Sequence, residues 1–206
     1  MKVLNLYAGL GGNRKLWTGC DVVAVENNEK IAAVYSRLNP SDEVVVGDAH
    51  EYLLANHSDF DFIWSSPPCQ THSKMNKATR HKRRRYPDMQ LYQEVIFLEH
   101  FFKGYWIVEN VVPYYTPIVE PSNQVGRHLF WSNFEFTADD VKRPAGFINL
   151  ANLAGKKALM DWLGIHFEES IYYAGNHCPA QILRNCVHPV IGKQIFDAIP
   201  TEGAAE

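Results

Sequence analysis

The chain has 206 residues, of which 46% are hydrophobic and 21% are charged, and its formal net charge is −3 at pH 7. This composition is that of one globular domain with a sizeable core, and the small net charge excludes a global attraction to nucleic acid, so any basic surface must be local. The four cysteines lack the spacing of a disulfide framework, and no apolar run approaches membrane-spanning length. We therefore expect a single domain in a reducing, intracellular setting and without membrane contact.

A glycine-rich turn follows the first predicted strand, which covers residues 2–7. The turn consists of Ala8, Gly9, Leu10, Gly11 and Gly12, and a helix is expected to open over 13–17. Glycines between a strand and a helix let the backbone approach a ligand closely and direct N–H groups at it. The pattern favours a nucleotide-type site, with an ordinary tight turn as the alternative.

Acidic residues end the next two predicted strands. Glu26 and Asn27 follow the strand over 21–25, at close to the roughly 20 residues that separate glycines from a ribose-binding acid in dinucleotide folds. A helix is predicted over 29–38. Asp48 and Ala49 follow a third strand over 43–46, and Asp48 either accepts a hydrogen bond from an exocyclic amine or caps a helix over 51–56.

A cysteine follows the fourth predicted strand, which covers residues 60–64. Two prolines, Pro67 and Pro68, fix the backbone after this strand and place Cys69 on a stiff turn at its carboxyl end. Ligands bind at that edge of an open α/β sheet, so we interpret Cys69 as a nucleophile. A buried structural thiol is the alternative.

The segment 74–86 is the strongly basic part of the chain. It contains seven lysines and arginines and no acid: Lys74, Lys77, Arg80, Lys82, Arg83, Arg84 and Arg85. So dense a charge favours a flexible loop that closes over a polyanion, whereas a solvated loop is the bland alternative.

A second candidate acid lies further along the chain. After a helix over 87–102, the buried strand 105–108 ends at Glu109, on the sheet edge expected for Cys69. Burial there predicts a raised pKa, which keeps the carboxyl group able to share a proton. Another strand over 125–136 carries Arg127 and His128 at its entry.

The last third of the chain is less regular in pattern. A helix is predicted over 150–163, a loop over 175–186, and a strand or turn followed by a helix over 187–199. A zinc set of His177, Cys178, Cys186 and His188 is conceivable, but the spacing is not that of a common finger, so no metal is predicted.

The motifs, in this order and over nearly the whole chain, resemble those of the DNA (cytosine-5)-methyltransferase family. Residues 5–12 resemble its first cofactor motif, 65–70 with Ser73 its Pro-Cys motif, and 109–111 its Glu-Asn-Val triplet. Residues 124–133 resemble its arginine motif, and 185–187 with Pro189 its last motif. The Pro-Pro-Cys-Gln and Glu-Asn-Val pair is the most specific part of this resemblance.

The resemblance implies one catalytic domain over residues 1–206 with a Rossmann-like α/β fold. The implied sheet is seven-stranded and mostly parallel, with one antiparallel strand and helices on both faces. The implied cofactor is S-adenosylmethionine, with Tyr7 stacking on or near it, Glu26 on the ribose and Asp48 on the adenine amine. The full set assigned to it is Tyr7, Ala8, Gly9, Gly11, Gly12, Glu26, Asn27, Asp48, Ala49, Pro67, Asn185 and Val187.

The implied reaction is methylation of cytosine C5 in double-stranded DNA after base flipping. Cys69 adds to C6, Glu109 holds a proton at N3, and a cation contacts O2. The family pattern Gln-x-Arg-x-Arg reads Gln124 to His128 here, so either Arg127 or His128 takes the O2 contact. The residues assigned to DNA are Gln70, Ser73, Lys74, Arg80, Lys82, Arg83, Arg84 and Arg85.

Members of this family usually have a longer target-recognition region before the last motif. Here only about fifty residues separate Phe134 from Asn185. We therefore expect a reduced recognition region over 134–184. The resemblance further implies a monomeric enzyme in the cytoplasm of a bacterial or phage-infected cell. Either the sequence context is short or a separate protein supplies specificity. Three other functions stay open: a tRNA cytosine-5 methyltransferase, a catalytically silent DNA-binding module, and an NAD-dependent oxidoreductase.

Overall fold

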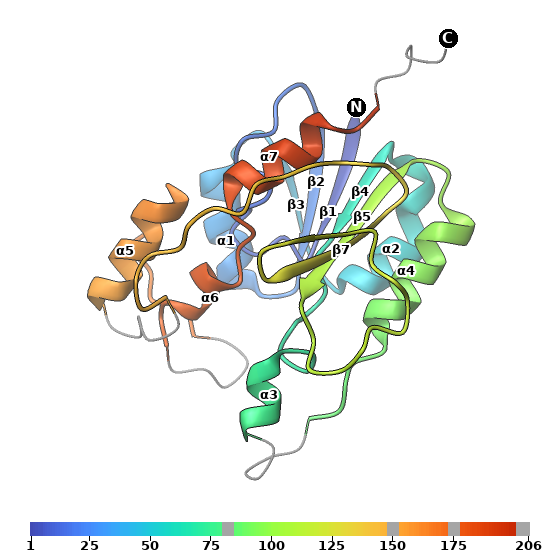
Figure 1. Cartoon of the computed structure of the whole chain (residues 1–206). Helices are drawn as coiled ribbons and strands as arrows, with labels where there is room; N and C mark the ends of the chain where they lie inside the picture. Colours follow the sequence, from blue (N-terminus) through green and yellow to red (C-terminus); the bar gives the residue numbers. More distant parts are fainter. Residues whose placement is uncertain (80–84, 148–152, 173–177, 201–206) are drawn as a thin grey trace.

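The computed structural model describes residues 1–79, 85–147, 153–172 and 178–200, and its strands form one seven-stranded sheet (Figure 1). The strands are β1 (Lys2–Leu6), β2 (Asp21–Glu26), β3 (Glu43–Val46), β4 (Phe62–Ser65), β5 (Tyr105–Val111), β6 (Asn123–Val125) and β7 (His128–Ser132). Their order is β3-β2-β1-β4-β5-β7-β6, and within this sheet only β7 runs antiparallel to its neighbours. The predicted fold class, a mostly parallel seven-stranded sheet, is confirmed.

The helices are α1 (Glu29–Leu38), α2 (Ala49–Asn56), α3 (Lys74–Thr79), α4 (Gln90–Phe101), α5 (Leu153–Leu163), α6 (Gln181–Arg184) and α7 (Pro189–Asp197), with a 3₁₀ turn, η1, at His57–Asp59. Side chains cap α1, α2 and α7. Asn28 accepts from two backbone N–H groups of α1, Asp48 accepts from one of α2, and His188 accepts from one of α7. These caps fix where each helix begins, because the first N–H groups of a helix have no partner within it.

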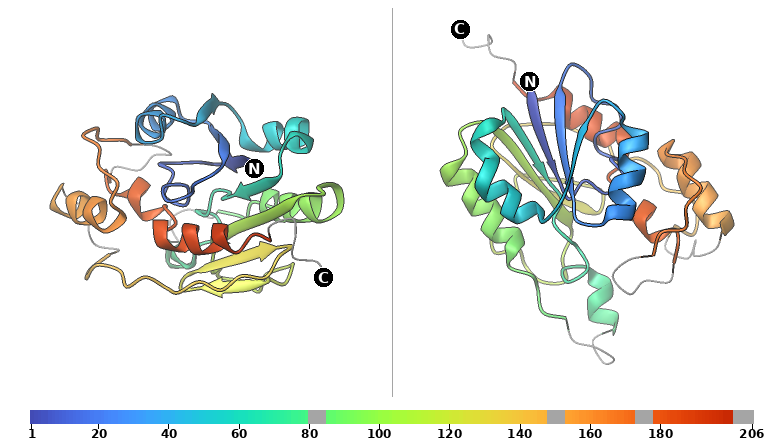
Figure 2. Two further views of the ribbon diagram at one scale, coloured as in Figure 1. Left: turned by 90° about the horizontal axis from the view of Figure 1, so that it is seen from above. Right: turned by 180° about the vertical axis from the view of Figure 1, so that it is seen from behind.

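Alternate residues of each strand face opposite layers of helices. Leu4 and Leu6 of β1 pack against α2 and α4, whereas Val3 and the fully buried Trp64 of β4 pack against α7. Tyr35 of α1 packs on Ala24, which shares the α7 face. Figure 2 shows α1 and α7 on one side of the sheet and α2 and α4 on the other, so both faces are covered.

A third cluster extends the α1 side outward. Leu159 and Leu163 of α5, together with Ile182 and Leu183 of α6, pack against Ile31 and Val34 of α1. Within the described residues, no helix is long and apolar enough to cross a membrane.

The helix expected over 13–17 is absent, and this prediction was wrong. Residues 12–16 form turns instead. Helix α7 packs beside β1 instead. Its Gly192 lies so close to the turn at Asn13 that an added Cβ would stand 2.2 Å from the Asn13 carbonyl oxygen. Trp17 donates a hydrogen bond to the Gly192 carbonyl and stacks on Phe196 at 4.8 Å. The end of the chain thus supplies the helix that covers β1.

Other boundaries also differ from the sequence prediction. The basic segment begins as helix α3 and not as a loop, and β5 continues through Glu109 to Val111. The expected strand over 125–136 is a hairpin, in which Gly126 and Arg127 form the turn between β6 and β7. The expected loop over 175–186 contains α6. A strand or a turn was expected before α7, and the described residues 178–188 form no strand there. Local pattern does not reveal the longer β5 or the hairpin, because pairing of β7 with β5 and β6 determines them.

Candidate active site

A cavity of about 380 Å³ lies at the carboxyl edge of the parallel strands. The four residues predicted to be catalytic line it, and so do all those predicted to bind the cofactor except Gly11. Its walls consist of Tyr7, Ala8, Gly9, Leu10, Gly12, Asn13, Glu26, Asn27, Asn28, Ile31, Asp48, Ala49, Ser66, Pro67, Pro68, Cys69, Gln70, Glu109, Val111, Arg127, His128, Ile182, Asn185, Cys186 and Val187. Segments from both ends of the chain therefore meet around one space.

Two glycines of the turn, Gly11 and Gly12, allow close packing against different parts of the protein. At Gly11, with φ of 73°, an added Cβ would stand 2.8 Å from the Tyr35 ring, so its role is close packing against α1. At Gly12 an added Cβ would stand 2.5 Å from the Val187 carbonyl oxygen. The turn can approach the segment before α7 closely because Gly12 has no side chain.

Two acids border the part of the cavity next to this turn. The buried Glu26 carboxylate accepts hydrogen bonds from the N–H groups of Gly9, at 3.0 Å, and Asn28, at 2.9 Å. Burial raises the pKa of Glu26, and these donors partly oppose the shift. Asp48 is exposed and accepts from the N–H of Glu51 at 2.9 Å, so it caps α2 and lines the cavity at the same time.

The turn that carries Cys69 is attached to the segment that follows β5. The side chain of Asn110 donates to the Pro67 carbonyl at 2.9 Å, and the N–H of Tyr114 donates to the His72 carbonyl at 3.1 Å. Ser73 forms an isolated bridge with Pro113. The two motifs that were most specific in the sequence therefore lie against each other.

Cys69 is half-buried at the cavity wall and Glu109 is buried, and burial has the largest effect on the pKa of both groups. Burial, with the Glu109 charge as the next cause, raises the pKa of the Cys69 thiol to about 11, while the nearby Arg127 lowers it. Burial raises the pKa of Glu109 to about 7, against opposing effects of Ser66 and Arg127. At neutral pH the thiol is protonated, and Glu109 can both hold and release a proton.

Arg127 and His128 differ in charge although they are adjacent. His128 is buried in β7 with its Nε2 atom 3.8 Å from Glu109 Oε1, and burial together with neighbouring arginines lowers its pKa to about 3. His128 is therefore neutral at neutral pH. Arg127 donates to the Arg184 carbonyl and lies 5.4 Å from the Phe147 ring centre, and its buried Nε has no hydrogen-bond partner among the described residues.

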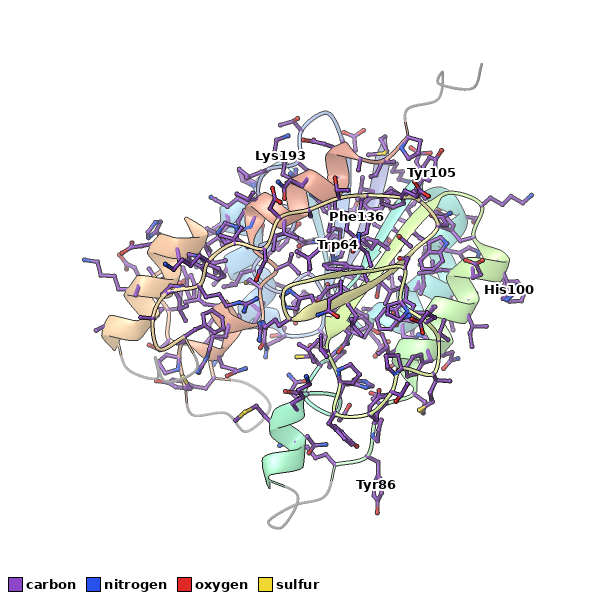
Figure 3. The ribbon with its side chains drawn as sticks, viewed as in Figure 1. Trp64, Tyr86, His100, Tyr105, Phe136 and Lys193 are labelled. Carbon is purple, nitrogen blue, oxygen red and sulfur yellow. The ribbon has the colours of Figure 1, made fainter. Side chains whose placement is uncertain are left out.

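The residues predicted to contact DNA are described only in part. Gln70 lines the cavity, and the Ser73 hydroxyl accepts from the N–H of Met75 at 3.3 Å, at the entry to α3, which begins with Lys74. The Arg85 carbonyl accepts from the Asn76 side chain at 2.8 Å. Figure 3 shows the neighbouring Tyr86 extending outward from the body of the protein. Arg80, Lys82, Arg83 and Arg84 lie outside the described residues.

The conceivable zinc set has other partners in the structure. Cys178 contacts Arg184 at 2.8 Å, Cys186 donates to the Ile182 carbonyl, and His188 lies 3.1 Å from the Trp162 carbonyl. His177 lies outside the described residues. In the part of the chain that is described, no group of three or more His, Cys, Asp or Glu residues is arranged to hold a metal ion.

Sequence analysis missed several residues that shape the site. Ile31 and Ile182 give the cavity an apolar wall, and Asn110 joins the two motifs. The fully buried Glu94 of α4 accepts from the side chains of Tyr7 and Ser65. Glu94 gave a signal in the sequence as an acid on the apolar face of a helix, and Asn110 gave one as the middle residue of the Glu-Asn-Val triplet. Ile31 and Ile182 look like ordinary core residues.

Comparisons with known proteins agree with the motifs. A family model described as C-5 cytosine-specific DNA methylase matches residues 1–116. Comparison with curated proteins found no match.

Several solved structures are similar to the chain. A hypothetical protein of Thermus thermophilus is 15% identical, with a TM-score of 0.45, over 68% of this chain and 75% of its own. A putative methyltransferase from Escherichia coli is 15% identical, with a TM-score of 0.43, over 64% and 73%. Fibrillarin from Aeropyrum pernix, solved with natively bound S-adenosyl-L-methionine, is 11% identical, with a TM-score of 0.35, over 54% and 46%.

Proposed function

Because the chain belongs to the C-5 cytosine-specific DNA methylase family, we propose that it transfers a methyl group from S-adenosylmethionine to C5 of cytosine in double-stranded DNA. The observation that carries this proposal is the cavity in which Cys69 and Glu109 meet the glycine turn. One space then holds a nucleophile, a proton-sharing acid and a nucleotide-type cradle.

The residues at the glycine end of the cavity fit the cofactor. Glu26 keeps free lone pairs for two ribose hydroxyls while it accepts from Gly9 and Asn28. Ile31 and Ile182 offer apolar surface to an adenine ring, and Asp48 offers a carboxylate to its amino group. When bound, the cofactor supplies an electrophilic methyl group on a sulfonium.

Cys69 and Glu109 act on the base. C5 of cytosine is a weak nucleophile, and it becomes reactive when the Cys69 sulfur, having lost its proton, bonds to C6. Glu109, with its pKa near 7, holds a proton at N3, where negative charge would otherwise develop. After methyl transfer the C5 proton passes to water, the bond between sulfur and C6 breaks with release of the thiolate, and the N3 proton returns to Glu109. The raised pKa of Cys69 means that deprotonation must accompany substrate binding.

Arg127 is the better of the two candidates for the contact with O2. A guanidinium keeps its charge in a buried site, and the Nε of Arg127 has no hydrogen-bond partner among the described residues. His128 is neutral at neutral pH, because burial lowers its pKa to about 3. We therefore assign the O2 contact to Arg127 and a packing role beside Glu109 to His128.

The DNA contacts are proposed from the sequence. The target base must leave the duplex to reach Cys69, and α3 with the basic segment that follows it is the candidate to bind the phosphates of the strand. We propose a short or relaxed sequence context, read by the chain as a monomer or with a separate protein that supplies specificity.

The test is covalent trapping on a duplex with 5-fluorocytosine in every cytosine position of one strand. With S-adenosylmethionine present, the wild-type protein is expected to form a complex that survives denaturation, since fluorine cannot leave as the C5 proton does. Cys69→Ser should form no such complex, while the matched control Cys20→Ser, a half-buried thiol away from the cavity, should be trapped like wild type.

Three results would contradict the proposal. A wild-type protein that binds S-adenosylhomocysteine but forms no adduct with any duplex would be a silent binding module. A protein trapped on single-stranded or transfer RNA carrying the same fluorinated base, and not on DNA, would be an RNA methyltransferase. Binding of NAD in place of S-adenosylhomocysteine, measured by thermal shift, would exclude the reaction class.

A further inference from the structure

One buried carboxylate, Glu94, connects three segments of the cavity wall. It lies on α4 and is fully buried. Its Oε1 accepts from the Tyr7 hydroxyl at 2.5 Å and lies 3.1 Å from His50 Nδ1, and its Oε2 accepts from the Ser65 hydroxyl at 2.6 Å. Glu94 itself does not line the cavity.

The three partners stand directly before or after residues that form the site. Tyr7 ends the first strand segment and precedes Ala8 and Gly9 of the cradle. Ser65 is the last residue of β4 and precedes the turn that carries Cys69. His50 follows Asp48 and Ala49 at the start of α2. The carboxylate thus joins the cofactor side of the cavity to the nucleophile side through one group.

The Tyr7 backbone needs such a restraint. Its φ of 54° lies in the left-handed region, which is unusual and strained for an aromatic residue. A strained residue of this kind persists only where its surroundings hold it. The hydrogen bond from its hydroxyl to Glu94 anchors the side chain, so that Ala8 and Gly9 are presented to the cavity.

A purely structural role explains this arrangement poorly. A buried charge with its donors is often no more stabilising than apolar residues of the same volume. Here the donors come from three segments that are distant in sequence, and two of them adjoin the residues assigned to chemistry. We propose that Glu94 is a positioning residue that holds the cofactor cradle and the Cys69 turn at a fixed separation.

The proposal, which rests on the proposed function, separates two effects that single substitutions can measure. Tyr7→Phe removes the anchor of the cradle and keeps the ring, so it should weaken the affinity for S-adenosylhomocysteine about tenfold. Its effect on the trapping rate at saturating cofactor should be smaller than about threefold. Ser65→Ala should do the reverse, with a rate about tenfold lower and an affinity within about threefold of wild type.

The carboxylate itself is tested with Glu94→Gln, which should impair both measurements. In the double variants with Tyr7→Phe or Ser65→Ala, the second change should add little, because the shared partner is already altered. Glu99→Gln is the matched control, since it is the same change at an exposed position of the same helix. If Glu94→Gln does not fold, the two single-donor variants still test the proposal.

The outcomes distinguish this proposal from the function on which it rests. Lower melting temperatures in all three variants, with affinity and rate unchanged below the melting transition, would overturn the positioning role. Equal effects of Tyr7→Phe and Ser65→Ala on both measurements would also overturn it. A wild-type protein that neither binds S-adenosylhomocysteine nor is trapped would instead refute the proposed function.

Discussion

Glu109 shows how a single residue connects stability with chemistry. Its side chain is buried in β5, and its pKa of about 7 stands well above the ordinary 4.5. The folded protein therefore binds a proton that the unfolded chain releases between these two pH values, and stability must fall as pH rises across that window. The same raised pKa lets the residue share a proton with a base near neutral pH.

Replacing Glu109 by Gln should make the protein more stable at pH 8. The amide keeps the shape and removes the buried charge, so the gain should approach about 3 kcal/mol at pH 8 and vanish near pH 4.5. Urea denaturation at the two pH values measures it. Glu120→Gln, at an exposed position, should show no such dependence. The buried carboxyl would not titrate as described if the difference in unfolding free energy between Glu109→Gln and wild type were the same at both pH values.

At the scale of elements, helix α7 near the C-terminus packs against the turn that follows β1. The turn after β1 forms no helix, and α7 lies in that place with Gly192 against Asn13. Next to this contact, Val187 and Cys186, which precede α7, lie against Gly12 at the wall of the cavity. Closure of the cofactor end of the site thus depends on a helix more than 170 residues away in sequence.

Gly192→Ala should destabilise the fold by about 1–3 kcal/mol, although alanine favours helix. The added Cβ would stand 2.2 Å from a backbone oxygen, which cannot move as a flexible side chain does. Denaturation in urea and calorimetric titration with S-adenosylhomocysteine should both show losses. Gly47→Ala is the control, because nothing lies within 4 Å of its Cβ position. Equal stability of the two variants would mean that α7 shifts without cost.

The same contrast explains what the sequence could predict. The boundaries of α1 and β3 follow from local hydrophobic period and polar ends, and the structure has them where expected. The helix over 13–17 was wrongly predicted because only α7, from the other end of the chain, excludes it. The Gly126 and Arg127 turn is set by pairing with β5 and by Asp140 beside Gly126. Glu94 could not be assigned a partner, since its three donors lie on separate elements.

At the scale of the whole molecule, the region expected to recognise the target, residues 134–184, packs against the core of the domain through its described part. Leu159, Leu163 and Ile165 pack on α1, and the buried Lys156 donates to three successive backbone carbonyls, those of Phe167, Glu168 and Glu169. The described parts of 134–172 thus use many side chains for packing. Sequence specificity requires side chains directed at base edges, and this packing leaves few such side chains within the described parts of the region.

We therefore expect methylation in a context of about two to three bases. Bisulfite sequencing of genomic DNA from a host without its own cytosine methylation, expressing this chain, measures the context directly. Cells expressing Cys69→Ser provide the background, since every remaining unconverted cytosine there is independent of the enzyme. Methylation confined to a six-base site would contradict the expectation, because so many base contacts need a larger recognition surface than the packing of α5 on α1 leaves in the described part of this region. A short context that lengthens when cell extract is added to the purified enzyme would identify a separate protein as the source of specificity.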